Sequence, residues 1–186
     1  MKESLLLLSK FIKNPKEVGA ITPSSAFLRK EIVDNINFET AHHIVELGPG
    51  LGAFTQSILE NARRDTKMIC FETNKDFCEH LGLKIKDPRL RILNVSAEQM
   101  QNQLREMNIK KVDCIVSGLP LFYFSDTQRE QIMSGIKAVL PVQGTFILFQ
   151  YTQRLQKLLE SHFETVEKKL VLGNLPPAFV YVCRDK

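Results

Sequence analysis

The stretch Ile44-Val45-Glu46-Leu47-Gly48-Pro49-Gly50-Leu51-Gly52-Ala53-Phe54-Thr55 decides the fold of this 186-residue chain. An apolar run of strand length, carrying a carboxylate near its end, leads through a glycine-rich turn into the start of a helix. The glycines permit backbone conformations that are closed to other residues, and they let a ligand approach the main chain. The first turn of the helix presents unpaired N–H groups. The sequence therefore predicts a nucleotide-like ligand at this turn.

The glycine spacing and the acidic residue before it indicate the type of ligand. A dinucleotide site reads G-x-G-x-x-G and places pyrophosphate on the helix N-terminus, whereas this turn reads G-x-G-x-G and follows Glu46. A carboxylate here would repel phosphate and attract a cation. S-adenosylmethionine, with its adenosine part and positively charged end, fits better than NAD. An ordinary strand-to-helix turn, with glycines for geometry alone, is the alternative interpretation.

Residues 45–52 resemble the first motif of the class I S-adenosylmethionine-dependent methyltransferases. The resemblance implies an α/β, Rossmann-like fold whose seven-stranded sheet is mostly parallel, with the last strand antiparallel and helices on both faces. It also implies methyl transfer. The cofactor contacts that it implies at this turn are Glu46, Gly48, Pro49, Gly50, Gly52 and Phe54.

Length and composition predict one globular domain. Hydrophobic residues make up 44% and charged residues 25% of the chain, which is typical of a folded rather than a disordered protein. The net charge of +4 permits attraction to nucleic acid or to an anionic membrane leaflet and does not choose between them.

The cysteines and histidines indicate neither disulfides nor a metal. Cys70, Cys78, Cys114 and Cys183 are scattered without a C-x-x-C pair, so we expect reduced thiols in a cytoplasmic protein and no bound metal. The apolar run 5–8 is too short for a spanning helix and lacks a cleavage site, so we expect neither export nor a membrane span.

From residue 42 onward, apolar runs of strand length alternate with helical patterns, which predicts parallel strands joined by crossover helices. Two more strands follow, joined by a Gly-Asn-Leu-Pro-Pro turn at residues 173–177, which indicates an antiparallel hairpin. The expected strands are 43–48, 67–72, 90–95, 112–117, 144–151, 163–172 and 178–184, and the expected helices are 53–62, 75–83, 97–107, 126–140 and 152–160.

Ligands of such sheets bind at the carboxyl ends of the strands. Glu72 ends the second strand about 20 residues after the glycine turn, the separation at which a carboxylate reaches ribose hydroxyls, and Thr73 follows it. Ser96 and Ala97 end the third strand and would face the adenine ring. Ser96 could equally be a helix N-cap.

The fourth strand leads into Ser117-Gly118-Leu119-Pro120-Leu121-Phe122-Tyr123-Phe124, which we predict to be the substrate wall. Its Leu-Pro step is similar to that of the rRNA adenine dimethylases. That family has Asn where this chain has Gly118, and a stacking Tyr or Phe where this chain has Leu121. The platform on which a base would stack is therefore missing.

Residues 2–13 form an amphipathic pattern with leucines on one side and lysines on the other. A short basic amphipathic helix can lie in an anionic membrane interface. Packing on the domain core is the alternative.

The blocks Asn14–Ser25 and Asn174–Tyr181 resemble the bacterial phospholipid N-methyltransferases, which methylate phosphatidylethanolamine. The similarity covers nearly the whole chain. It implies that residues 1–40 are amphipathic and cofactor-capping helices, with Gly19, Ile21 and Thr22 on the cofactor, and that residues 41–186 bind S-adenosylmethionine. It also implies docking on the inner face of the cytoplasmic membrane.

The leading hypothesis is an S-adenosylmethionine-dependent N-methyltransferase for phosphatidylethanolamine headgroups. In this hypothesis, Ser117, Leu119, Pro120 and Tyr123 orient the headgroup amine, and Ser117 also lies near the cofactor. The Asn174 turn and Tyr181 form a second wall of the substrate site. The alternatives are an rRNA adenine N6-methyltransferase, a small-amine methyltransferase, and a module that binds the cofactor without catalysis. RNA is less favoured because of Gly118, Leu121 and the small net charge.

Overall fold

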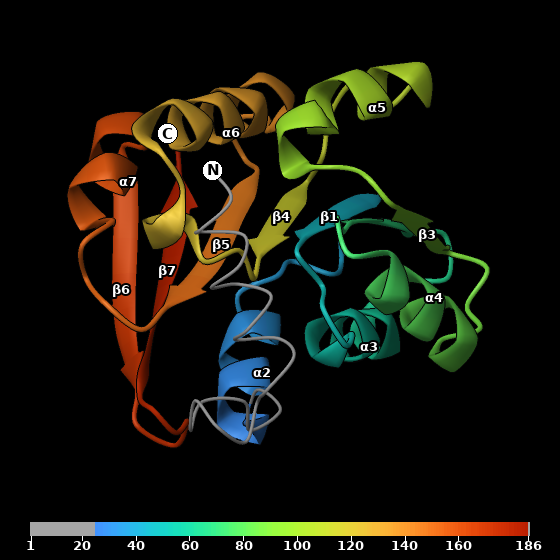
Figure 1. The fold of residues 1–186 in the computed structure, drawn as a ribbon, viewed down its shortest axis with the longest axis horizontal. Coiled ribbons are helices and arrows are strands. Elements are labelled where there is room, and N and C mark those ends of the chain that lie inside the picture. Colours follow the sequence, from blue (N-terminus) through green and yellow to red (C-terminus); the bar gives the residue numbers. More distant parts are fainter. Residues whose placement is uncertain (1–24, 186) are drawn as a thin grey trace.

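The computed structural model describes residues 25–185, and seven strands run through its centre (Figure 1). The strands are β1 (His43–Leu47), β2 (Lys67–Phe71), β3 (Leu90–Leu93), β4 (Cys114–Ser117), β5 (Thr145–Gln150), β6 (Thr165–Val171) and β7 (Ala178–Arg184). They form one sheet in the order β3-β2-β1-β4-β5-β7-β6. All seven agree with the strands expected from the sequence to within two residues at each end.

The strands β3, β2, β1, β4 and β5 are parallel neighbours, whereas β7 lies antiparallel to β5 and to β6. The chain order reverses between β1 and β4, so the carboxyl ends of these two strands flank the switch point at which ligands of open α/β sheets bind. The predicted Rossmann-like sheet with an antiparallel last strand is confirmed.

Helices cover both faces of this sheet (Figure 1). One layer holds α2 (Ala26–Val33), α3 (Ala53–Asn61) and α4 (Lys75–Lys84), and the other holds η1 (Ala97–Gln99), α5 (Met100–Glu106), α6 (Asp126–Val139) and α7 (Gln156–His162). A single 3₁₀ turn, η2 (Leu121–Tyr123), follows β4. Each layer closes its own apolar core, because the buried strands alternate their side chains between the two faces.

Side-chain caps begin several of these helices. Ser25 accepts a hydrogen bond from Leu28 N at the start of α2, as expected for a serine before that helix. Asn74 caps α4 in the same way, and Ser125 with Gln128 forms a capping box on α6. Local sequence therefore fixes where these helices begin.

Two expected helices differ from the structure. The helix expected at 152–160 begins only at Gln156, because residues 151–154 are exposed and Leu155 is the first side chain that the core can bury. The helix expected at 97–107 begins as the 3₁₀ turn η1 before continuing as α5. In both cases the pattern identified the element and missed how its first turn forms.

Several predictions concern residues outside the described part of the chain. They are the amphipathic helix at 2–13 and the cofactor contacts Gly19, Ile21 and Thr22. Of the segment 1–40, the structure describes α2, which buries Leu28 and Ile32 against the core beneath the sheet. The division at residue 40 stays a prediction.

The four cysteines are unpaired thiols, and all but Cys78 are buried. Within residues 25–185, no group of three or more His, Cys, Asp or Glu side chains is arranged to hold a metal ion. Among the helices of this part of the chain, none has the length and apolar character needed to cross a bilayer.

We expect Gly52→Ala to destabilise the protein more than Gly50→Ala. Both glycines have positive φ angles, 80° and 54°, so each variant carries the strain of a left-handed residue, about 1–2 kcal/mol. A Cβ at Gly52 would lie 2.2 Å from Leu81 Cδ1, whereas one at Gly50 would meet nothing within 4 Å. Overpacking should therefore cost Gly52→Ala a further ~1–3 kcal/mol. Urea unfolding measures the difference, and equal losses in the two variants would contradict the packing argument.

Candidate functional site

The predicted site residues meet at the carboxyl edge of the sheet, where β1, β2 and β4 end. The backbone hydrogen bonds of the sheet continue past the strand ends, since Gly48 N donates to Phe71 O at 2.9 Å and Gly118 N donates to Leu47 O at 2.9 Å. The glycine turn is thereby held between the segments that follow β2 and β4. Residues far apart in sequence form one site.

All three glycines of the turn have positive φ angles: 71° at Gly48, 54° at Gly50 and 80° at Gly52. Gly52 is the N-cap of α3, and its amide donates to Pro49 O at 2.9 Å. The turn is therefore specific to glycine at these positions. Pro49 is buried, and Phe54 packs its ring 5.4 Å from that of Phe149.

Glu46 is a buried carboxylate with one unused oxygen. Its Oε2 accepts hydrogen bonds from Thr55 Oγ1 at 2.6 Å and from Cys70 Sγ at 3.6 Å, whereas Oε1 has no partner among the described residues. Burial raises the pKa of Glu46 to about 7, against the lowering effect of the Thr55 and Cys70 hydrogen bonds, and nearby Glu72 raises it further. A buried acceptor without a partner is costly unless a ligand supplies the donor.

Glu72 ties the end of β2 to the glycine turn. Its Oε2 accepts from Gly50 N at 3.2 Å and its Oε1 accepts from Asn74 N at 2.9 Å. The side chain is nearly buried, while Thr73 beside it is exposed. The two strand-end carboxylates, Glu46 and Glu72, thus border the same turn.

Ser96 caps a helix, as one of the two interpretations of this residue predicted. Its Oγ accepts from Glu98 N at 3.3 Å and begins η1, and the following Ala97 is buried. The cap uses an oxygen lone pair and leaves the hydroxyl proton to donate elsewhere.

The segment after β4 is pressed against the glycine turn. A Cβ at Gly118 would lie 2.8 Å from Gly48 O, and a Cβ at Gly48 would lie 2.8 Å from Leu119 Cδ2. Leu121 is 1% exposed and belongs to the core, so it offers no surface to a ligand. This part of the wall has neither a polar side chain at position 118 nor an aromatic platform at position 121.

Gln150, at the end of β5, is a site residue that the sequence did not identify. Its side chain is buried, and Nε2 donates to Leu119 O at 3.0 Å. The same carbonyl accepts from Leu121 N at 2.8 Å. Both acceptor positions of Leu119 O are thus used within the chain. No local motif marks Gln150, because its partner lies 31 residues away.

Arg129 on α6 holds the rest of the segment. Its Nη1 donates to the carbonyls of Leu121, Phe122 and Phe124, at 3.4, 3.2 and 2.6 Å, and its Nη2 pairs with Asp126. One guanidinium therefore binds three carbonyls of this segment, including that of Leu121, which also accepts from Phe124 N within the 3₁₀ turn. The sequence did not identify this role of Arg129 either.

The remaining predicted wall residues differ in accessibility. Ser117 is buried, and its Oγ accepts from Leu119 N at 3.3 Å. Pro120 is half-buried, and Tyr123 is 55% exposed. Tyr181 is fully buried in the core that packs under α6 and α7, so the expectation that it forms a second wall was wrong. Its position in the middle of β7 directs the side chain into the core.

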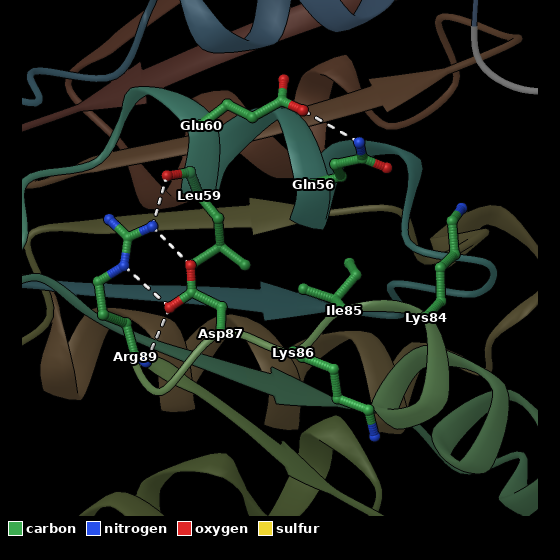
Figure 2. A pocket seen from close by; sticks show the side chains of 8 residues that line it. All are labelled: Gln56, Leu59, Glu60, Lys84, Ile85, Lys86, Asp87 and Arg89. Atoms are coloured by element: carbon green, nitrogen blue, oxygen red, sulfur yellow. Dashed lines mark hydrogen bonds and ion pairs between the residues drawn. The ribbon is translucent and has the colours of Figure 1, made fainter.

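A hollow of about 320 Å³ lies beside α3 (Figure 2). Arg89 is one of its lining residues, and its guanidinium pairs with Asp87 at 2.6 Å and donates to Leu59 O at 2.7 Å and to Ala62 O at 2.8 Å. It thus caps the last carbonyls of α3. Among residues 25–185, none of the predicted site residues lines this hollow, so we assign it a structural role.

The raised pKa of Glu46 should make the ligand-free protein less stable as the pH rises. Between pH 4.5 and about 7, the unfolded chain loses this proton while the folded chain keeps it, so stability falls and then levels off above pH 7. The full effect is about 3 kcal/mol. Glu46→Gln, which is neutral at every pH, should lack this part of the pH dependence. Urea unfolding of both proteins from about pH 5 to 8 tests this, and parallel pH profiles would contradict it.

Comparison with known proteins identifies relatives of two kinds. Residues 24–176 match the family model described as ribosomal RNA adenine dimethylase. An ornithine lipid N-methyltransferase of Singulisphaera acidiphila is 31% identical over 188 residues, covering 99% of this chain and 97% of that protein. A ribosomal RNA small subunit methyltransferase A of Malacoplasma penetrans is 31% identical over 115 residues, covering 59% of this chain and 40% of that protein.

Solved structures share the fold at low sequence identity. A 1,6-didemethyltoxoflavin-N1-methyltransferase of Burkholderia thailandensis, with bound S-adenosylhomocysteine, superposes with a TM-score of 0.73 at 14% identity, covering 98% of this chain and 87% of that one. Human methyltransferase-like protein 13, also with S-adenosylhomocysteine, gives 0.68 at 12% identity, covering 87% and 83%. The chain therefore belongs to the ribosomal RNA adenine dimethylase family and is a Rossmann-like methyltransferase that uses S-adenosylmethionine as methyl donor.

Proposed function

We propose that this enzyme methylates the primary amine of a membrane aminolipid, phosphatidylethanolamine first among them. The observation that carries the proposal is the wall after β4, where Gly118 packs on Gly48 O and Leu121 is buried. A purine base would find no polar side chain and no stacking surface at these positions. A headgroup amine needs neither. The end-to-end similarity to an ornithine lipid N-methyltransferase supports the same class of acceptor.

The glycine turn fits the methyl donor. Glu46 Oε1 is a buried acceptor without a hydrogen-bond partner among the described residues, and the amino group of the cofactor's methionine part would supply the donor. The space beside Gly50, where a Cβ would meet nothing within 4 Å, leaves room for a ligand along the main chain. Glu72 would take the ribose hydroxyls. Gly48, Pro49, Gly52, Phe54, Thr73, Ser96, Ala97 and Ser117 would complete the site, together with Gly19, Ile21 and Thr22 from outside the described residues.

When bound, S-adenosylmethionine supplies a methyl group on a sulfonium, and S-adenosylhomocysteine is the product. The protein's part is to hold a neutral amine in line and to exclude water. Of the proposed orienting residues, Tyr123 presents the most accessible polar group, while Ser117 and Pro120 shape the wall. Leu119 O is already engaged by Gln150 and Leu121, so its role would be to fix the wall through these bonds.

The proposed location is the inner surface of the cytoplasmic membrane, with residues 2–13 as one contact. A second candidate is an rRNA adenine N6-methyltransferase, because the family model carries that description. The similarity to the Malacoplasma rRNA enzyme reaches only 40% of that protein. The substrate is therefore best tested by direct competition between lipid and RNA.

Purified protein with methyl-labelled S-adenosylmethionine should label phosphatidylethanolamine in vesicles. Parallel reactions contain ornithine lipid vesicles, or ribosomal RNA at low and moderate salt. Label in either amine-bearing lipid supports the aminolipid class and identifies its preferred member. Thin-layer chromatography with scintillation counting measures the products. Label in RNA with none in lipid would overturn the proposal and establish the second candidate.

Glu46→Gln should weaken binding of S-adenosylhomocysteine by about tenfold or more, because a charge-assisted hydrogen bond to the ligand's amino group contributes roughly 1.5–3 kcal/mol. Wild-type affinity should rise from pH 6 to 8, since binding favours the ionised carboxylate, and the variant should lack this rise. Titration calorimetry measures both. Glu60→Gln, on the exposed surface of α3, is the matched control, and unchanged affinity in Glu46→Gln would refute the assignment of the amino group to Glu46.

A further inference from the structure

The turn between β6 and β7 lies at the same edge of the sheet as the site. β5 ends at Gln150, which pairs with Phe179 near the start of β7, and Val171 at the end of β6 pairs with Ala178. The carboxyl end of β5 faces the same way as that of β4, because these strands are parallel. Residues 172–177 therefore project from the edge that carries the glycine turn and the substrate wall.

This turn is joined firmly to the beginning of α2, which lies beside it in Figure 1. Ser25 N donates to Asn174 Oδ1 at 3.0 Å, and Asn174 Nδ2 donates to Pro176 O at 2.8 Å. Phe27 lies against Gly173, where a Cβ would come within 2.5 Å of the phenyl ring. The hydrogen bonds and the ring contact make one ordered unit from two distant parts of the chain.

Three large apolar side chains project from this unit, and we call them the apolar tip: Phe27, Leu172 and Leu175. They are 67%, 73% and 75% exposed. Scattered exposed apolar residues are ordinary on a protein surface, but a group of them marks an interaction site. The buried Asn174 between them holds the turn from inside while the leucines on either side face outward.

Exposed lysines, each paired with a less exposed carboxylate, flank the apolar tip on both of its elements. Lys30 on α2 and Lys169 on β6 have side chains that are 72% and 68% exposed. Glu31, the partner of Lys169, is only 15% exposed, so the ammonium is the outer member of that pair. Asp34, the partner of Lys30, is half exposed. Apolar side chains with outward lysines beside them match an anionic bilayer, whose headgroups attract the cations and whose acyl boundary accepts the apolar groups.

We propose that the apolar tip inserts into the interface of an anionic phospholipid bilayer and brings the active-site edge to the level of the headgroups. The inference rests on the proposed aminolipid substrate, whose amine lies in that plane. It adds a docking element to the membrane contact proposed for residues 2–13. Moving Leu and Phe side chains from water into the acyl boundary is favourable, so the three side chains of the tip act together in binding.

The chain contains no tryptophan, so Phe27→Trp gives a single fluorescent probe at the tip. Vesicles of phosphatidylethanolamine and phosphatidylglycerol should shift its emission to the blue, and brominated acyl chains should quench it. Leu83→Trp, on α4 and equally exposed at 74%, is the matched control and should show neither effect. An unshifted and unquenched Phe27→Trp would overturn the proposal.

The double variant Phe27→Ser, Leu172→Ser, at two tip residues outside the 173–177 turn, should lose at least tenfold in vesicle binding by co-sedimentation. Leu83→Ser and Val142→Ser, at other exposed positions, should bind like wild type. Binding of S-adenosylhomocysteine should be unchanged. Undiminished vesicle binding by the double variant, or a tip-dependent dimer in sedimentation velocity, would overturn the proposal and assign the tip to another part of the chain or to a second copy.

Methylation assays separate this proposal from the proposed function. Against monomeric short-chain phosphatidylethanolamine the double variant should match wild type, whereas against vesicles it should be at least tenfold slower. A wild-type protein that binds vesicles through the tip but labels no lipid would refute the aminolipid substrate and leave the docking surface standing. A protein that labels vesicle lipid equally well with and without the tip would refute the docking surface alone.

Discussion

The close approach of two backbone turns, at Gly48 after β1 and at Gly118 after β4, is the constraint on which the site depends. Gly118 has no room for a side chain, since a Cβ there would lie 2.8 Å from Gly48 O, and Gly48 adopts a positive φ of 71° with the side chain of Leu119 packed beside it. The amide of Gly118 continues the ladder onto Leu47 O. This contact places the turn that fits the methyl donor directly beside the wall that would present the acceptor, which proximity catalysis requires.

Glu46 shows what such a site costs the fold. Its carboxylate is fully buried, and one of the two oxygens has no partner among the described residues. Burial raises the pKa of Glu46 to about 7 and so makes the ligand-free protein less stable near neutral pH. A structural role alone would be better served by a neutral residue. The arrangement is intelligible if a cationic group completes it, and proteins tolerate such local conflicts where they bind ligands.

Much of the fold was readable because its signals are local. The strands are short apolar runs between turn residues, and Ser25, Asn74 and Ser125 cap helices through bonds to the next few residues. What escaped detection is the bonding of side chains to main-chain carbonyls. Gln150 and Arg129 hold the segment after β4 through bonds to its carbonyls, and carbonyl partners leave no trace in side-chain patterns. Tyr181 was wrongly expected at the substrate site. Whether a residue at the centre of a strand is buried depends on which helices pack over it, and the sequence of the strand does not show this.

The sequence by itself determined the class of fold, the methyl donor and the departures at Gly118 and Leu121 from the rRNA dimethylase pattern, since these depend on residue types at fixed spacing. The residues of the donor site stay a prediction. Tertiary structure alone decided that Gly118 has no room for a side chain, that the Leu119 carbonyl is held by β5, and that Phe27, Leu172 and Leu175 share one surface at the active-site edge. The physical reason is the distance between the contacting residues along the chain. Spacing along the chain sets local geometry, whereas contacts between distant residues, 31 positions apart for Leu119 and Gln150 and 149 for Ser25 and Asn174, follow only from how the sheet aligns its strands.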